Sequence, residues 1–215
     1  MALPKQYAQI DEWKTLIFLY TSALKEIGTK IEILNDEFVH VHNYNPIEHV
    51  KSRIKSPESI VRKLRKQGHE ETIENMQKYL HDIAGIRIIC SFSSDIYRIA
   101  QMIANQDDVI VLQIKDYIKH PKPNGYKSYH MVVSIPVFLS DGPVDTKVEI
   151  QIRTIAMDFW ASLDHQLKYK KSLIDDDGEI SEELRKCAHV IAETDQKMLA
   201  IRKKIEAQGV TVRRD

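Results

Sequence analysis

The sequence predicts an α+β fold: a mixed five-stranded β-sheet surrounded by helices, with a long helical segment at each end of the chain. Strand-like and helix-like stretches alternate through the middle of the chain, and heptad-like apolar stripes mark residues 17–41 and 184–205. With 215 residues, of which 43% are hydrophobic, the chain can bury one substantial core. We therefore expect an N-terminal helical segment at 1–44, a central domain at 45–172 and a C-terminal helical segment at 173–215.

The first helix is indicated by apolar residues that alternate steps of three and four, a spacing that places them on one helical face. These residues are Ile17, Tyr20, Leu24, Ile27, Ile31, Leu34, Phe38 and Val41. Asn45-Pro46 ends this helix. Pro57 is a favoured first-turn residue and Gly68 a natural C-terminal cap, so a second helix is expected between them. A third helix is expected at 70–80.

The remaining strands are predicted from two-residue alternation of apolar and polar residues, and the remaining helices from apolar residues spaced by three and four. Strands are expected at 83–92, 109–118, 127–136 and 147–153, and helices at 95–105, 158–170 and 180–207. The turn Asp141-Gly142-Pro143 joins the last two strands. Gly85 indicates a bulge or a close approach of the backbone. The final helix carries the second apolar stripe, made of Leu184, Cys187, Ile191, Thr194, Met198, Ile201 and Ile205.

Composition and charge exclude several classes of protein. The 31 lysines and arginines balance 31 aspartates and glutamates, so a general nucleic-acid binder is disfavoured as the primary function. The apolar run at 16–20 is far too short to span a bilayer, and the N-terminus lacks the pattern of a cleavable signal. The two cysteines, Cys90 and Cys187, cannot build a disulfide framework. These features predict a cytoplasmic protein without membrane contact.

Basic residues crowd the stretch 51–66, where Glu58 is the only acid: Lys51, Arg53, Lys55, Arg62, Lys63, Arg65 and Lys66. Arg53 and Lys55 project in parallel from an extended approach, and helical spacing places Ser59 and Lys63 on neighbouring faces of the helix that follows. This arrangement suits a polyanion such as a triphosphate, because arginine binds phosphate bidentately and lysine supplies a mobile point charge. The alternative is a solvated surface helix.

One strand has a fully polar face. Glu149, Gln151 and Arg153 alternate with Val148, Ile150 and Ile152, so the two sets point to opposite sides of the sheet. Asp82 enters the neighbouring sheet region, and two carboxylates on adjacent strands suit Mg²⁺. The alternative is a sheet with one solvated face. A metal phosphohydrolase built on His81-Asp82 is excluded, because the other histidine and aspartate ligands have no candidates at sensible spacing.

A loop stiffened by prolines precedes the third of the expected strands. Pro121-Lys122-Pro123-Asn124-Gly125-Tyr126 turns at Asn-Gly and presents the tyrosine at the mouth of the sheet. A tyrosine in this position can stack on a base, with Lys115, Lys122 and Lys127 nearby for phosphates. The alternative is a β-turn whose tyrosine packs on the core.

Together these segments resemble the synthetase domain of the RelA/SpoT-type (p)ppGpp synthetases, and in particular the small alarmone synthetases of bacteria. The resemblance covers 45–170 and rests on Arg53-x-Lys55, DIAGIRI at 82–88, KDYIKHPKPNGYKSYH at 115–130, VEIQIRT at 148–154 and MDFWASLDH at 157–165. It implies a fold related to nucleotidyltransferases. It also implies transfer of pyrophosphate from ATP to the ribose 3′-OH of GDP or GTP, with release of AMP and without alarmone hydrolysis.

The resemblance assigns roles by position. It implies that Arg53 and Arg87 flank adenine, while the ATP phosphates are held by Lys55, Ser59 and Lys63. Asp82 and Glu149 are implied to bind Mg²⁺, and Glu149 also to activate the 3′-OH. Tyr126 is implied to stack on guanine, with the rest of GDP or GTP surrounded by Lys115, Lys122, Asn124, His130 and Gln151.

Assembly and competing functions stay open at this level. The apolar stripes of both terminal helices predict a homo-oligomer, with a tetramer favoured, unless both stripes pack within the chain. One competing function is a nucleotidyltransferase-like enzyme with another acceptor. The other is an RNA-binding module that uses the basic stretch, where RNA could also compete with nucleotide.

Overall fold

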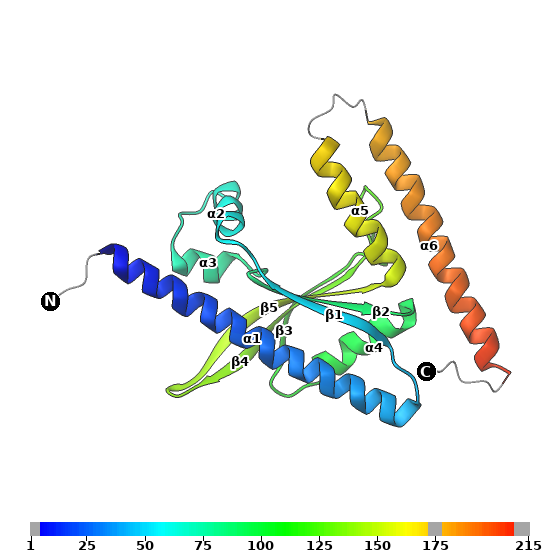
Figure 1. Cartoon of the computed structure of the whole chain (residues 1–215), viewed down its shortest axis with the longest axis horizontal. Helices are drawn as coiled ribbons and strands as arrows, with labels where there is room; N and C mark the ends of the chain where they lie inside the picture. The colour runs from blue at the N-terminus through cyan, green and yellow to red at the C-terminus, as the bar shows by residue number, and fades with distance from the viewer. Residues whose placement is uncertain (1–4, 172–177, 209–215) are drawn as a thin grey trace.

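The structure is a computed structural model that describes residues 5–171 and 178–208 (Figure 1). The strands are β1 (Ile47–Ile54), β2 (Ala84–Cys90), β3 (Ile110–Asp116), β4 (Tyr129–Leu139) and β5 (Gly142–Thr154). The helices are α1 (Lys5–His42), α2 (Pro57–Lys66), α3 (Ile73–Tyr79), α4 (Ser93–Ala104), α5 (Ile155–Lys171) and α6 (Glu179–Glu206). The predicted α+β fold with a five-stranded sheet and long terminal helices is confirmed.

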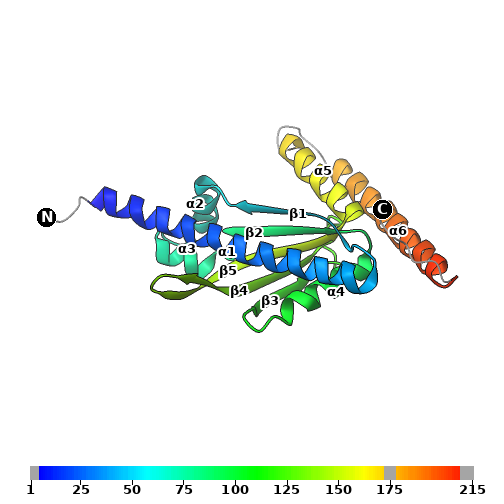
Figure 2. The ribbon, with the colours of Figure 1, turned by 60° about the horizontal axis from the view of Figure 1, so that its bottom comes forward.

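The sheet is mixed. Its strand order is β1-β2-β5-β4-β3, in which β2 and β5 are parallel and all other neighbours are antiparallel. Figures 1 and 2 show α1 lying along one side of the sheet, and α5 and α6 forming an antiparallel pair at one end. Because β2 and β5 run in the same direction, the residues that begin β2 lie beside the middle of β5. This placement brings Asp82 toward Glu149.

The core lies on the face of the sheet that packs against α1 and α4. The alternating apolar residues of the two central strands are buried there: Ala84, Ile86, Ile88, Val148, Ile150 and Ile152. From α1, the predicted stripe supplies Tyr20, Leu24, Ile27, Ile31 and Leu34 to the same core, and Phe38 is buried beside Tyr44. The α1 stripe therefore packs within the chain and is not available as an oligomer interface, which is the second of the two possibilities given above for this stripe.

Several boundaries differ from those that the periodicity predicts. The extended approach before α2 is a full edge strand, β1, whose side chains are mostly exposed and so carry no apolar alternation. The last strand begins at Gly142 rather than at 147, because its first residues pair with β4 in an exposed hairpin arm. Helix α5 begins at Ile155 rather than at 158, and the Thr154 hydroxyl accepts a hydrogen bond from the Met157 amide at 3.2 Å. Gly85 lies in regular pairing, so no bulge occurs there.

Helix α6 docks through a face that contains two charged residues and only part of its predicted apolar stripe. Ala188, Asp195 and Arg202, spaced by seven residues, face the body of the protein. Asp195 accepts a hydrogen bond from the buried Thr154 hydroxyl at 3.0 Å, and Arg202 Nη1 lies 3.1 Å from Asp95 Oδ2. Much of the predicted stripe stays exposed, with Met198 at 52% and Ile201 at 49%. Of the predicted stripe, Leu184 and Ile191 are partly buried and the other five residues are exposed, so the docking face is rotated away from the predicted one.

None of the helices within the described residues combines the length and apolar character that a membrane crossing requires.

Candidate active site

The face of the sheet opposite α1 carries a line of polar residues. Strand register places Lys51, Arg87, Gln151, His130 and Lys115 in one row across all five strands. The next row contains Arg53, Gly85 and Glu149. Direct partners in a sheet point to the same side, so these side chains converge on one surface.

A cavity of about 230 Å³ opens on this surface. Among the residues that line it are Arg53, Asp82, Arg87, Glu149 and Gln151, all of which carry roles predicted from the sequence. Gly85 forms part of the floor between Arg53 and Glu149, and its lack of a side chain leaves the backbone open to a ligand. Of the two possibilities predicted for Gly85, a bulge or a close approach of the backbone, the second applies: here a ligand in the cavity can come close to the Gly85 backbone.

Asp82 joins the basic cluster to this cavity. Its Oδ2 accepts hydrogen bonds from Lys55 Nζ at 2.5 Å and from Lys63 Nζ at 2.9 Å. Burial favours the neutral acid, but the two ammonium groups outweigh it and hold the pKa of Asp82 below its ordinary value. Its Oδ1 is buried and has no hydrogen-bond partner among the described residues. An ionised carboxylate with one unsatisfied oxygen beside a cavity is suited to a cation.

Glu149 is the second carboxylate at the cavity. Its Oε1 lies 3.6 Å from His130 Nδ1, and its Oε2 accepts a hydrogen bond from Gln151 Nε2 at 2.9 Å. Burial again favours the neutral acid, whereas contact with His130 and the Gln151 hydrogen bond bring the pKa of Glu149 below its ordinary value. The negative charge of Asp82 acts on the pKa of Glu149 in the opposite sense, and both carboxylates line the same cavity. Their donor set fits Mg²⁺.

Glu149 is one member of a closed polar ring, formed by Tyr126, His130, Glu149, Gln151 and Arg153. Tyr126 Oη lies 2.8 Å from His130 Nε2 and accepts a hydrogen bond from Arg153 Nη2 at 2.5 Å. The same Arg153 nitrogen donates to Gln151 Oε1 at 3.0 Å, which closes the ring. The tyrosine ring is therefore fixed from its hydroxyl end, while the loop before it sets its other end.

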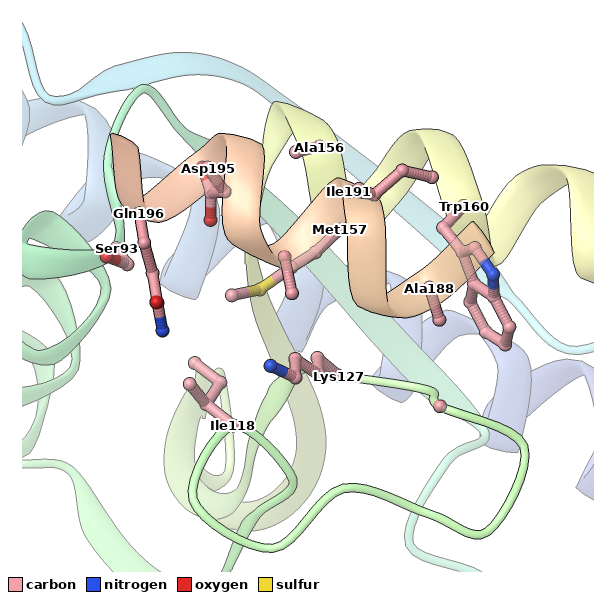
Figure 3. Close-up of a pocket in the computed structure, with 12 residues that line it drawn as sticks. Ser93, Ile118, Lys127, Ala156, Met157, Trp160, Ala188, Ile191, Asp195 and Gln196 are labelled. Carbon is pink, nitrogen blue, oxygen red and sulfur yellow. The ribbon is translucent and has the colours of Figure 1, made fainter. Parts of the chain in front are cut away.

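That loop packs against α6 (Figure 3). Gly125 has φ +86°, and a Cβ placed on it would lie 2.5 Å from the Ala188 Cβ, so only glycine fits. Asn124 Nδ2 donates to Asp164 Oδ2 at 3.4 Å, and Lys122 Nζ lies 4.8 Å from the centre of the Tyr126 ring. Lys122 therefore lies next to the Tyr126 ring, whereas Asn124 contacts α5.

Lys127 and part of the basic stretch lie elsewhere. Lys127, expected near phosphates, lines a separate cavity of about 80 Å³ beside Trp160 and Asp195 (Figure 3). Arg65 forms an exposed ion pair with Glu71 on the surface of α2. The basic stretch therefore serves in both of the ways considered above. Lys51 and Arg53 line the cavity, whereas Arg65 belongs to a solvated surface.

Ser59 and Lys115 lie at the margins of the site. Ser59 is in the first turn of α2, where its hydroxyl accepts a hydrogen bond from Arg62 Nη2 at 3.3 Å. Lys115 is the direct strand partner of His130 on the exposed edge strand β3. Lys63 is four residues after Ser59 on α2, and it reaches Asp82.

Two residues with central contacts were not assigned to the site from the sequence. Arg153 was recognised only as part of the polar face, and Asp158 only as the start of a helix. Asp158 Oδ1 accepts a hydrogen bond from Arg153 Nη1 at 3.0 Å and lies 3.3 Å from Arg87 Nη1. An arginine on a strand that is otherwise buried was the available signal, because such a charge requires a partner.

Comparison with known proteins identifies the family. Residues 52–173 match the family described as a region found in RelA / SpoT proteins. GTP pyrophosphokinase YwaC of Bacillus subtilis (strain 168) is 46% identical over 197 residues, covering 92% of this chain and 93% of that protein. The crystal structure of small alarmone synthetase 2 from Bacillus subtilis has 44% identity and a TM-score of 0.80, covering 90% of this chain and 99% of that one. Small alarmone synthetase 1 from Bacillus subtilis, bound to its product pppGpp, has 32% identity and a TM-score of 0.82, covering 91% and 99%. The chain therefore belongs to the RelA/SpoT family.

Proposed function

We propose that this protein synthesises (p)ppGpp by transferring pyrophosphate from ATP to the ribose 3′-OH of GDP or GTP, releasing AMP. The observation that carries the proposal is the pairing of Asp82 and Glu149 at one cavity, between a cationic cluster and a fixed tyrosine. The named relatives, a GTP pyrophosphokinase and small alarmone synthetases, support the same reaction. The activity proposed is synthesis without alarmone hydrolysis.

On the ATP side, Arg53 and Arg87 enclose adenine from the cavity wall that they line. Lys55 and Lys63 then turn from Asp82 toward the triphosphate, where Ser59 adds a hydroxyl from the first turn of α2. These cations balance the charge that develops on the bridging oxygen as AMP leaves.

On the guanosine side, Tyr126 stacks on guanine and the polar ring holds its plane. The surrounding polar contacts come from Lys115, Lys122, Asn124, His130 and Gln151. His130 contacts both Tyr126 and Glu149, and Gln151 contacts both Arg153 and Glu149. Recognition of guanine by Tyr126 therefore fixes the ribose beside the Glu149 carboxylate.

Glu149 is proposed to take the proton of the 3′-OH. The 3′ oxygen then forms a bond to the β-phosphorus of ATP while the bond from that phosphorus to the α-phosphate oxygen breaks, and AMP departs with that oxygen. The carboxylate is ionised at neutral pH and can therefore accept this proton, and its two neighbours hold it in place. Alignment of both nucleotides supplies the rest of the acceleration.

Mg²⁺ is the proposed cofactor. Asp82 and Glu149 would hold it, and when bound it neutralises phosphate charge in the reacting complex. The unsatisfied Asp82 Oδ1 is the observation in favour, because a buried carboxylate oxygen is rarely left without a partner. With Asp82 engaged by the metal, Lys55 and Lys63 would be available to the phosphates.

An acceptor screen tests the proposed function. Purified protein with ATP and Mg²⁺ is incubated with GDP, GTP, ADP or CDP, and nucleotides are separated by anion exchange. We expect AMP and a 3′-diphosphate product with the guanine nucleotides alone. Transfer to another acceptor would replace the assignment, and release of pyrophosphate from added ppGpp would contradict synthesis without hydrolysis. Adding RNA tests its proposed competition, which should fall steeply with salt.

Tyr126 provides the first prediction. Tyr126→Ala removes a stacking platform worth roughly 1–3 kcal/mol per base, so the KM for GDP should rise about tenfold or more while the KM for ATP stays nearly unchanged. Tyr126→Phe keeps the ring but loses the contacts to His130 and Arg153, and its KM for GDP should fall between those of the other two proteins. Steady-state kinetics with each substrate varied decides the matter. An unchanged KM for GDP in Tyr126→Ala would remove the stacking role.

The second prediction concerns assembly. We propose a homo-oligomer, most simply a tetramer, because α5 exposes Ile155, Phe159, Leu163 and Leu167 at four-residue spacing, and Phe159 is 57% exposed. Met198 of α6, which is 52% exposed, lines a groove together with Ile155 and Phe159 and extends this surface. Light scattering should give a mass near four times 25.0 kDa, and Phe159→Glu should lower it. A monomer at micromolar concentration would contradict the proposal.

Domain limits and location are further parts of the proposal. Residues 45–172 are proposed to form the catalytic domain, which the family match to 52–173 supports, with helical segments at 1–44 and 173–215. A cytoplasmic location is proposed because both nucleotide substrates are supplied there.

A further inference from the structure

Asp158 lies between the two halves of the proposed site. It projects from the first turn of α5, and a single oxygen of its carboxylate meets two guanidinium groups. Arg153 Nη1 lies 3.0 Å from this Oδ1, and Arg87 Nη1 lies 3.3 Å from it. Arg153 belongs to the guanosine side through Tyr126, whereas Arg87 belongs to the proposed adenine wall. One carboxylate therefore joins both sides.

Arg153 is held too firmly to be a surface charge. It is only 4% exposed, and its guanidinium also donates to Ser128 Oγ, Gln151 Oε1 and Tyr126 Oη. A lysine cannot reproduce these contacts, because they use the planar fork of the guanidinium. Any movement of Arg153 therefore changes the hydroxyl end of Tyr126 directly.

Arg87 is less firmly held. Its Nε is buried without a hydrogen-bond partner among the described residues, and its side chain is partly open to the cavity. Burial lowers the pKa of Arg87, the positive charge of Arg153 lowers it further, and Asp158 acts in the opposite sense. The two arginines thus repel each other, and Asp158 neutralises that repulsion.

We propose that Asp158 is a positioning residue that couples the two nucleotide sites, by holding Arg87 for adenine and Arg153 for the guanine platform in one arrangement. This inference rests on the proposed function for the names of the two nucleotides. Arg153 is already held in the free protein, so the group that a nucleotide orders is Arg87; its ordering keeps the shared Asp158 carboxylate in place and strengthens the Asp158–Arg153–Tyr126 contacts on which the second nucleotide depends. Linkage requires the effect to be reciprocal.

Binding without turnover tests the coupling. GDP is titrated by calorimetry with and without an ATP analogue that carries a methylene between its α and β phosphorus atoms, which cannot transfer pyrophosphate. We expect the analogue to tighten GDP binding by about fivefold or more, a usual size for coupling between sites. In Asp158→Asn, which keeps the shape but loses the charge, this ratio should approach one. An unchanged ratio in Asp158→Asn, or a ratio of one in the unmodified protein, would overturn the inference.

Steady-state kinetics separates positioning from general damage. In Asp158→Asn both KM values should rise roughly fivefold, which corresponds to ~1 kcal/mol, with a smaller change in kcat. Asp158→Glu should restore part of the coupling, because it returns the charge. The matched control is Asp141→Asn in the β4–β5 turn, which should behave as the unmodified protein. Thermal melts confirm that each variant is folded.

A double variant gives an independent test. Tyr126→Phe and Asp158→Asn both act on GDP through Arg153, so their combined effect on the KM for GDP should be smaller than the product of the single effects. A fully multiplicative result would contradict the shared route. Failure of the proposed function is recognised separately, since it would appear as absent product formation in the unmodified protein even if the binding ratio were as expected.

Discussion

Replacing Glu149 by glutamine is expected to reduce turnover by roughly 10²–10⁴-fold, the usual contribution of a general base. The amide keeps the size of the side chain and can still bond to Gln151, but it cannot accept the proton of the 3′-OH. Both nucleotides should still bind with affinities near those of the unmodified protein, because the loss falls on the transition state. Rapid-quench kinetics together with calorimetric titration measure the two effects.

A matched control is Glu193→Gln on α6, which removes an exposed carboxylate paired with His189 and should leave turnover unchanged. The pKa of Glu149 lies below its ordinary value, so its carboxylate form persists as the pH falls toward that lower pKa. We therefore expect no loss of rate from its protonation between about pH 6 and pH 9. Near-normal turnover in Glu149→Gln would remove Glu149 from the chemical step.

Replacing Asp82 by asparagine is expected to lower the rate by roughly 10²-fold or more, comparable to the loss of a strong electrostatic contact in a reacting complex. The magnesium concentration that gives half-maximal activity should rise as well, because one of two proposed ligands loses its charge. Lys55 and Lys63 lose their shared partner but remain available to phosphate, so ATP affinity should change much less than the rate. Activity measured across a series of Mg²⁺ concentrations tests both parts.

The control for Asp82 is Asp108→Asn. Asp108 also pairs with a lysine, Lys30 of α1, at 2.8 Å, but on the other side of the molecule from the cavity. Removing it breaks an ion pair of the same kind without touching the proposed metal ligands. If Asp82→Asn kept the normal magnesium dependence, the assignment of this carboxylate to the metal would be wrong.

The polar face of β5 could be predicted because a strand alternates with a period of two. Val148, Ile150 and Ile152 enter the core, and Glu149 and Gln151 must then face the other side. The convergence of Asp82 and Glu149 was predicted only in outline, as two carboxylates on adjacent strands, and the parallel register that places Gly85 beside Glu149 comes from the structure. The orientation of the β5 side chains follows from the alternation within one strand, and the position of Asp82 follows from the pairing of β2 with β5.

The partnership of Arg87, Arg153 and Asp158 could not be predicted in this way. It depends on where α5 begins, and Thr154 starts that helix three residues earlier than the apolar period indicates. The inner face of α6 was missed for a related reason. Buried Asp195 and partly buried Arg202 are satisfied by Thr154 and Asp95, which lie far away in the sequence, so hydrophobicity alone does not select the docking face.

The fate of the individual phosphorus atoms of ATP tests the central claim most directly. Two parallel reactions contain GDP, Mg²⁺ and ATP labelled with radioactive phosphorus at either the α or the β position. Pyrophosphate transfer predicts that the β label appears in the guanosine product and the α label in AMP, in equal amounts. Appearance of the α label in the guanosine product would show nucleotidyl transfer instead, and would contradict the proposed reaction.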